Sequence, residues 1–397
     1  MSTPSNYNDF RNINVNNTFN SLRQATLLKE QDNSIQPTAI IFCEGNFGKA
    51  DGKTANGLIR HSQKYRIVSV IDSKLAGLDS GKVLDQKANG IPIVASLEDA
   101  INLSETLPQY FIFGLAPTSG FLSSLERKII LHAMSLKMHI INGLHEFLTE
   151  DLAFVDASIE HGVRIFDIRK PKRKEELQIF SGRVREVNCP RIAVLGTDCA
   201  LGKRTTATIL ANELTNKGLN VVMIATGQTG IMQGARYCVA LDAVPSQFCA
   251  GELESVIVKA YEKENPDLII IEGQGALSHP AYSTSSFILR GSCPTSVILQ
   301  HAPKRQHRSD FPNMPMPSVA SEIILIETFS DTSVIGLTLN HEGMSSDDIF
   351  TAIDGYSNEL GIQVTDPLSQ PVEKLLDIVL SAYPQLASKL AEKNEVS

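Results

Sequence analysis

The sequence lacks any apolar run that approaches the roughly 20 residues needed to span a bilayer. Its asparagine- and serine-rich start also lacks the apolar segment of a signal peptide. None of its six cysteines forms a C-x-x-C pair with another, and this scatter fits reduced thiols better than a disulfide framework or a zinc site. We therefore expect a cytoplasmic protein with no membrane partner and no bound metal.

The chain also lacks an excess of positive charge. Its 36 lysines and arginines are outnumbered by 44 aspartates and glutamates, so the formal net charge is -8. This balance argues against nucleic acid as the main partner, although a local basic site can still bind an anion. At 397 residues, with 42% hydrophobic and 20% charged side chains, the chain is typical of a globular protein with more than one domain.

The first part of the chain divides into an arm and a domain. Residues 1–36 are polar and predict a poorly ordered arm with one short helix near residues 22–28. From residue 37 to 170 apolar strands alternate with helices, which predicts a Rossmann-like domain whose parallel sheet is covered on both faces. The expected strands are 38–43, 65–72, 91–94, 110–114 and 138–141, and the expected helices are 55–63 and 123–136.

Residues 171–189 are rich in lysine and arginine and lose apolar periodicity, which is typical of a solvated linker. The second domain, residues 190–397, is predicted to have strands at 191–196, 220–225, 267–272, 295–300, 322–327 and 333–340. The predicted fold class is α/β, with an N-terminal Rossmann-like domain followed by a C-terminal phosphate-loop NTPase-like doubly wound domain. In such folds ligands bind at the carboxyl ends of the strands.

The most informative segment runs from residue 191 to 206, where an apolar strand enters a glycine loop that ends in Gly-Lys and opens a helix. Glycines let the backbone approach a polyanion, the first helix amides point at it, and the lysine adds a full charge. The segment predicts a cofactor-binding phosphate loop made of Gly196, Thr197, Asp198, Cys199, Gly202, Lys203, Arg204, Thr205 and Thr206.

This loop departs from the usual G-x-x-x-x-G-K-[ST] pattern in two ways. Five residues separate its glycines, and Arg204 stands where a magnesium-binding hydroxyl is expected. At 4 Å and an effective dielectric near 20, an arginine would repel a dication by roughly 8 kcal/mol. Arg204 therefore points elsewhere, or the site works without the metal, or Thr205 takes over the metal after a one-residue shift of the helix start.

An extra guanidinium suits a metal-free ligand that carries several phosphates, because arginine binds phosphate in bidentate fashion. Coenzyme A is such a ligand. The alternative is that Arg204 is an exposed residue in the first turn of a helix and binds nothing.

Further polar residues follow other strands of the second domain. Glu272 ends a buried strand and must find a partner or change its pKa. His279 is either a base or a structural loop histidine. The loop after residue 225 and the basic run 301–308 either bind a small anionic substrate or lie in solvent. The candidate substrate-binding residues are Gln228, Thr229, Arg236, Gln274 and Arg305.

The first domain contains weaker signals. Residues 44–54 form a second glycine-lysine loop, in which Lys53 and Thr54 either cap the next helix or contact a ligand. Residues 142–146 and 167–171 follow later apolar stretches, and we expect them to face the space between the two domains.

Taken in order along residues 38–385, eight motifs resemble the D-glutamate N-acetyltransferases, a family long known only as a domain of unknown function. They are Lys53-Thr-Ala, Val70-Ile-Asp, Asn142-Gly-Leu-His-Glu-Phe-Leu, Asp167-Ile-Arg-Lys-Pro, Gly196-Thr-Asp-Cys-Ala-Leu-Gly-Lys-Arg-Thr, Thr226-Gly-Gln-Thr-Gly, Glu272-Gly-Gln-Gly-Ala-Leu-Ser-His-Pro and Asp366-Pro. The resemblance implies a Rossmann-like domain, a phosphate-loop domain, and transfer of an acetyl group from acetyl-CoA to the amino group of D-glutamate. The second domain also resembles dethiobiotin synthetase, which implies that Asn340 holds the adenine of coenzyme A or ATP.

Acetylation of an amine needs a base, donors for the thioester oxygen and cations for the substrate carboxylates. We assign the base to Glu272 or His279, the donors to the amides of residues 227–230 or 273–275, and the carboxylate clamp to Arg236 or Arg305. We expect a small-molecule amino acid substrate and a homo-oligomer. Two other functions stay open, namely a Mg-ATP-dependent ligase or kinase of the dethiobiotin synthetase type and a non-enzymatic nucleotide or coenzyme A sensor.

Overall fold

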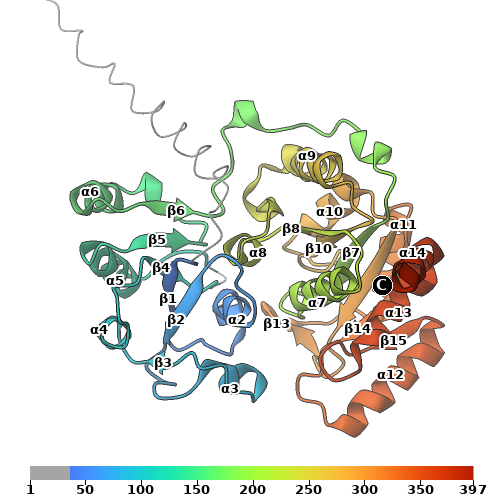
Figure 1. Ribbon diagram of the computed structural model, residues 1–397, viewed down its shortest axis with the longest axis horizontal. Coiled ribbons are helices and arrows are strands. Elements are labelled where there is room, and N and C mark those ends of the chain that lie inside the picture. The colour runs from blue at the N-terminus through green and yellow to red at the C-terminus, as the bar shows by residue number, and fades with distance from the viewer. Residues whose placement is uncertain (1–35, 118, 397) are drawn as a thin grey trace, which may run out of the picture. The chain divides into compact units, whose positions relative to one another are not determined.

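The computed structural model describes residues 36–117 and 119–396, so the expected arm and its short helix, apart from residue 36, lie outside the described residues. The N-terminal half contains a six-stranded sheet in the order β3-β2-β1-β4-β5-β6, with all neighbouring strands parallel (Figure 1). Its strands are β1 (Thr38–Phe42), β2 (Arg66–Ile71), β3 (Ile93–Val94), β4 (Tyr110–Phe113), β5 (His139–Asn142) and β6 (Ile165–Asp167).

The helices of this half begin where the sequence offers caps. Asp79, Ser96, Ser123 and Asp151 each accept a hydrogen bond from an amide in the first turn of the helix that follows. The helices are α2 (Lys53–Arg60), α3 (Ser80–Asp85), α4 (Leu97–Asn102), α5 (Ser124–Ser135) and α6 (Leu152–His161). The two helices predicted in this half are confirmed as α2 and α5, with ends that differ by a few residues.

The C-terminal half contains a seven-stranded parallel sheet in the order β15-β14-β11-β7-β10-β8-β9. Its strands are β7 (Arg191–Gly196), β8 (Val221–Ala225), β9 (Tyr237–Cys238), β10 (Leu268–Glu272), β11 (Ser296–His301), β14 (Ser333–Leu339) and β15 (Gln363–Thr365). A separate antiparallel hairpin joins β12 (His307–Arg308) to β13 (Phe311–Pro315). Because β7 is the middle strand, the phosphate loop that follows it lies at the centre of the carboxyl edge.

Helices cover both faces of this second sheet. One face packs against α7 (Lys203–Asn216), α13 (Val372–Ala382) and α14 (Pro384–Val396) through a cluster that includes Leu210 and Leu376. The other face packs against α9 (Ser246–Glu264), α10 (Thr284–Ser292) and α11 (Val319–Phe329), while α12 (Ser346–Leu360) contacts β15. This arrangement confirms the predicted doubly wound fold.

The strand predicted at 322–327 is wrong, because these residues lie inside α11. Ser318 caps the helix, and Val319, Glu322 and Ile326 form its buried stripe at helical spacing. The four apolar residues between the two glutamates resemble a buried strand, yet the side chain of Ile324 is 65% exposed. A short apolar run does not distinguish a strand from a helix by itself.

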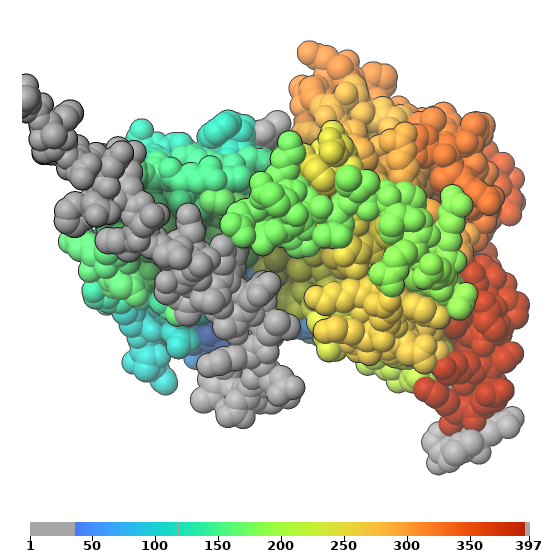
Figure 2. Space-filling model, turned by 90° about the horizontal axis from the view of Figure 1, so that it is seen from above, coloured from blue at the N-terminus to red at the C-terminus, as the bar shows by residue number. Residues whose placement is uncertain are grey.

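The segment between the two halves, residues 171–189, is largely exposed but is attached to the second half by specific contacts. The buried carboxylate of Glu252 on α9 accepts from the amide of Gln178 at 2.8 Å and pairs with Lys172, and Glu254 accepts from the amides of Ser181 and Val184. Figure 2 shows this green segment on the surface beside the yellow α9. Two glutamates therefore hold the connection against the second half.

The two halves pack directly on one another through α2 and α8 (Gln228–Gln233). The side-chain amide of Gln233 donates to the carbonyl of Gly57 at 2.7 Å, and the hydroxyls of Thr54 and Thr229 are 3.3 Å apart. A Cβ on Gly57 would lie 2.6 Å from Cγ2 of Thr229, so only glycine allows this approach. The contact places the start of α2 beside the loops of the second sheet.

Within residues 36–117 and 119–396, no helix is both long enough and apolar enough to cross a bilayer.

Gly57→Ala should lower the free energy of unfolding by about 1 to 3 kcal/mol, because the new methyl group overpacks the contact with Thr229. Gly355→Ala is the matched control, since Gly355 lies inside α12 with no atom near its would-be Cβ and should gain up to about 1 kcal/mol from helix propensity. Urea unfolding measures both. Stabilisation of both variants alike would contradict the tight packing of α2 on α8.

Candidate functional site

The phosphate loop leaves β7 at Gly196 and enters α7 at Lys203. Gly202 adopts φ +96° as the N-cap residue, and Ala200 adopts φ +49°, a conformation that side chains disfavour. No side chain caps α7, so its first amides face the loop. Lys203 is buried, donates to the carbonyl of Asp198, and has its pKa lowered to about 8 by this burial.

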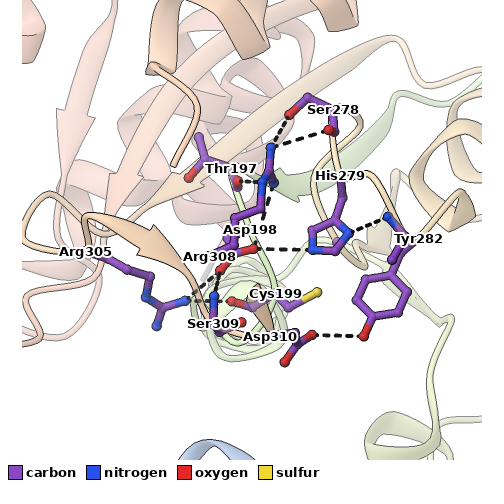
Figure 3. Close-up of polar contacts among 12 residues, drawn as sticks. Thr197, Asp198, Cys199, Ser278, His279, Tyr282, Arg305, Arg308, Ser309 and Asp310 are labelled. Carbon is purple, nitrogen blue, oxygen red and sulfur yellow. Dashed lines mark hydrogen bonds and ion pairs between the residues drawn. The ribbon is translucent and has the colours of Figure 1, made fainter. Parts of the chain in front are cut away.

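Asp198 is the buried anion that organises the loop (Figure 3). Its Oδ2 accepts from the amide of Ser309 at 2.8 Å and from Arg305 at 3.2 Å. Its Oδ1 lies 3.9 Å from the guanidinium of Arg308 and 3.8 Å from Nε2 of His279, without a hydrogen bond. The carboxylate is therefore surrounded by cations and donors from the hairpin and its flank.

The imidazole of His279 is fixed on both sides. Its Nδ1 accepts from the amide of Ala281 at 3.2 Å, which in the neutral ring places the proton on Nε2, the atom that faces Asp198. The ring stacks on Tyr282 with centroids 4.5 Å apart and contacts Phe311. Burial and the charge of Arg308 lower its pKa. The lone pair of this histidine is thus already used inside the protein.

Asp198, Cys199 and His279 are residue types that bind zinc, and one ligand atom from each lies within 4.8 Å of the others. Two features argue against a metal there. A ligating Nε2 would require a proton on Nδ1, where the ring meets the N–H of Ala281. Arg305 and Arg308 already compensate the charge of Asp198.

Arg204 points toward the end of the neighbouring strand. Its Nη1 lies 3.5 Å from Oε2 of Glu272, the last residue of β10, and its Nε donates to Gln233 at 2.8 Å. Glu272 is 5% exposed and also accepts from the amide of Thr226 at 3.0 Å. Burial raises the pKa of Glu272, while Arg204 opposes this rise. Arg204 is therefore not the exposed first-turn residue of the alternative interpretation, since its side chain is 19% exposed and pairs with Glu272.

Several predicted cofactor residues instead hold the second sheet together. Thr206 donates to the side chain of Gln300 at 2.6 Å, and Thr197 shares a 2.8 Å hydrogen bond with the buried His301. The side-chain amide of Asn340 donates to the carbonyl of Leu201 at 3.1 Å. The polar groups of these three side chains lie at the loop but are hydrogen-bonded to other residues of the chain. Thr205 is half-buried in the first turn of α7.

The predicted carboxylate clamps are engaged elsewhere. Arg236 is 72% exposed at its side chain, pairs with Glu264 at 2.9 Å and lies over the ring of Tyr237. Arg305 donates to the carbonyl of Cys199 at 2.8 Å and to Glu342, so it braces the phosphate loop. The structure does not bring these two arginines together.

The other predicted substrate residues do gather. Gln274 donates to the hydroxyl of Thr226 at 2.9 Å, next to the start of α8. Gln228 and Thr229, the first residues of α8, both contact the hydroxyl of Thr54. They lie between the second sheet and the first turn of α2.

The sequence interpretation missed the hairpin as part of the site. Arg308 is buried and donates to Ser278, and Asp310 accepts from the hydroxyl of Tyr282 at 3.0 Å. The basic run 301–308 signalled cations at this strand end, but their target, the buried Asp198 in the phosphate loop, was not visible in the local pattern. The motif residues Asn142 and Asp167 are also internal, since they bind one another at 2.8 Å and cap nearby loop amides.

Comparison with known proteins agrees with this architecture. Two family models match the chain, one described as a domain of unknown function with a Rossmann-like fold (DUF1611_N) over residues 73–171 and one as its P-loop domain (DUF1611_C) over residues 178–376. A D-glutamate N-acetyltransferase from a Pseudoalteromonas species is 31% identical over 272 residues, covering 67% of this chain and 80% of the relative. A second protein of that name, from Tritonibacter scottomollicae, is 27% identical over 67% of this chain and 79% of the relative.

The chain belongs to the DUF1611 family. The crystal structure of a DUF1611 family protein from Anabaena variabilis has a TM-score of 0.80 and 31% identity, and the match covers 87% of this chain and all of the other. The resemblance stated from the motifs is confirmed. Family membership and the name shared by these relatives support an N-acetyltransferase activity.

Asp198→Asn should destabilise the protein by about 3 kcal/mol, because it leaves two guanidiniums beside a neutral buried group. Glu342 is the other partner of Arg305, and its side chain is 48% exposed. Glu342→Gln should therefore change stability by less than about 1 kcal/mol. Urea unfolding of both variants tests the difference. Equal small effects would show that Asp198 does not organise the loop.

The buried His301 should make the free energy of unfolding depend on pH. Burial, with a further effect of Arg305, lowers its pKa from 6.5 to about 4 in the folded state. Between these values the unfolded chain binds more protons, so stability falls as the pH falls. From about pH 7 to about pH 5 the loss due to this residue should be about 2 kcal/mol. The pH slope of urea unfolding should be shallower in His301→Gln, and an unchanged slope would refute the assignment.

Proposed function

We propose that this N-acetyltransferase moves the acetyl group of acetyl-CoA to the amino group of D-glutamate, without a metal ion. The single observation that carries the metal-free part is the approach of Arg204 to Glu272 at 3.5 Å. In phosphate-loop NTPases the hydroxyl after the lysine and an acid from a neighbouring strand hold magnesium between them. Here a guanidinium belonging to the chain takes the place of that cation.

The donor site that we assign is the phosphate loop and the start of α7. Lys203, the free amides at the start of α7 and the guanidinium of Arg204 are positive groups suited to the pyrophosphate of coenzyme A. The side chains of Thr197, Thr206 and Asn340 are used inside the protein, so we assign them the support of this loop instead of direct contact with the cofactor.

Of the two candidate bases, the geometry favours Glu272. A base must accept the proton that the ammonium group of the acceptor loses before the amine attacks the thioester carbon. His279 has its accepting nitrogen bound to the amide of Ala281, whereas Glu272 is a buried carboxylate with a raised pKa at the carboxyl edge. The amides of Thr226 and Gly227 already donate to Glu272, so we assign residues 273–275 as donors to the thioester oxygen.

The deciding assay mixes the purified protein with acetyl-CoA and D-glutamate in EDTA. We expect release of CoA and formation of N-acetyl-D-glutamate, with no ADP formed when Mg-ATP replaces acetyl-CoA. We also expect CoA species to raise the unfolding temperature, because a ligand that binds the native state stabilises it. ADP release that requires magnesium, without acetyl transfer, would instead indicate the ligase or kinase.

Glu272→Gln should lower kcat by about 10²- to 10⁴-fold if Glu272 is the base. Wild-type activity should fall as the pH falls through a pKa above the ordinary value of 4.5, because burial raises the pKa of this group. That acid limb should vanish in Glu272→Gln and persist in His279→Gln. The reverse result, loss of the limb only in the histidine variant, would reassign the base.

A further inference from the structure

Lys53 is a cation beside the phosphate loop with no partner in the described part of the chain. It is the first residue of α2, is exposed, and its ammonium group makes no hydrogen bond or ion pair with residues 36–117 or 119–396. A lysine is unfavourable at the positive end of a helix, and no acidic residue in the first turn of α2 offsets it. An anion at this place would remove the conflict.

The position of Lys53 is fixed by packing between the two halves. Next to it, the hydroxyl of Thr54 lies 3.3 Å from that of Thr229 and 3.4 Å from the amide of Gln228. Burial is the main influence on the pKa of Cys199 and Lys203 in the phosphate loop and of His145 in the first half, and the charge of Lys53 makes a small further contribution to each. Lys53 therefore stands between the donor loop and the carboxyl edge of the first sheet.

On that edge Arg169 is a second cation, and His145 is an imidazole whose pKa is lowered by burial and by the charge of Arg169. His145 follows β5, is 44% exposed at its side chain and lies 3.9 Å from Asp242 of the second half. Arg169 follows β6 and pairs with the same carboxylate at 3.2 Å, while its buried Nε has no hydrogen-bond partner among the described residues. Arg169 is only 8% exposed, so a guanidinium with an unused donor lies behind His145.

Three carboxylates near His145 and Arg169 are already neutralised or bound. Glu146 pairs with Arg127 at 2.8 Å, and Asp167 accepts from Asn142 and nearby loop amides. Asp242 is shared between Arg169 and His145. Among the described residues, Lys53 is thus a cation without an ion pair at this edge.

We propose that Lys53 and His145, with Arg169 behind them, bind the side-chain carboxylate of an acidic acceptor amino acid. This inference rests on the proposed function. The amine must lie near Glu272 in the second half, and the α-carboxylate is attached to the same carbon as that amine. The distal carboxylate is the group that can extend toward the first half. The clamp is thereby placed on the Rossmann-like half, in contrast to the expected Arg236 and Arg305.

The test compares D-glutamate with its neutral isostere D-glutamine in wild type and Lys53→Met. The variant should raise the KM for D-glutamate about 10- to 100-fold, the usual range for losing a charged hydrogen bond. The KM for D-glutamine and for acetyl-CoA should change little, and Lys53→Arg should retain most of the discrimination. Lys217→Met is the matched control, since Lys217 is an exposed lysine at the far end of α7, about 20 Å from Lys203.

Equal effects on both acceptors, or no effect on either, would overturn the inference. Binding measured by calorimetry separates it from the proposed function, because the Kd of D-glutamate requires no turnover. If wild type acetylates D-glutamate but Lys53→Met does so with unchanged KM, only the clamp fails. If no acetylation occurs yet D-glutamate binds wild type more tightly than Lys53→Met, the clamp stands and the reaction fails.

Discussion

The buried carboxylate of Asp198 is the interaction on which the site depends. It is fully buried, yet Ser309, Arg305 and Arg308 surround it from the hairpin and its flank. Burial of one charge is unfavourable unless cations and hydrogen-bond donors surround it. Removal of one member of such a group leaves the remaining buried charges without a partner, which is destabilising. The phosphate loop, the hairpin and the loop of His279 are therefore held in one arrangement by a single side chain.

A second constraint on the site is Arg204, the residue that follows the phosphate-loop lysine. In a magnesium-dependent enzyme the cation between the loop and the neighbouring strand comes and goes with the nucleotide. In this protein Arg204 and Glu272 provide opposite charges from the chain itself, at 3.5 Å. A permanent cation suits a ligand whose phosphates are bound and never cleaved, which is the role of coenzyme A in acetyl transfer. Under the proposed function, the same fold serves phosphate binding without phosphoryl transfer.

The close packing of α2 on α8 makes the Rossmann-like half part of the site. Gly57 allows the two helices to approach closely. The side chain of Gln233 on α8 donates a hydrogen bond to the backbone of α2. Gln233 also accepts from Arg204, so the contact between the halves and the cation at the strand end share one amide side chain. Movement of one half would therefore change the electrostatics of the other.

Much of the fold and the outline of the site followed from the sequence alone. Apolar strands that end in glycine loops, and a Gly-Lys pair at a helix start, depend on residues close together in the chain, so local patterns predicted both sheets and the phosphate loop. The prediction failed where local patterns are ambiguous, as in the apolar run of α11, and the charge of residues 171–189 gave no sign of their contacts with Glu252 on α9.

Only the tertiary structure decided which charges meet. Arg204 and Glu272 are 68 residues apart, and Arg305 and Asp198 are 107 apart, so no spacing rule connects them. An arginine has the same chemistry on a clamp, a brace or the surface, and its neighbours determine which role it takes. By itself the sequence determined most of the strands, the phosphate loop and the family. The packing of the chain determined the partner of each ionic group, because Coulomb interactions depend on distance in space and not along the chain.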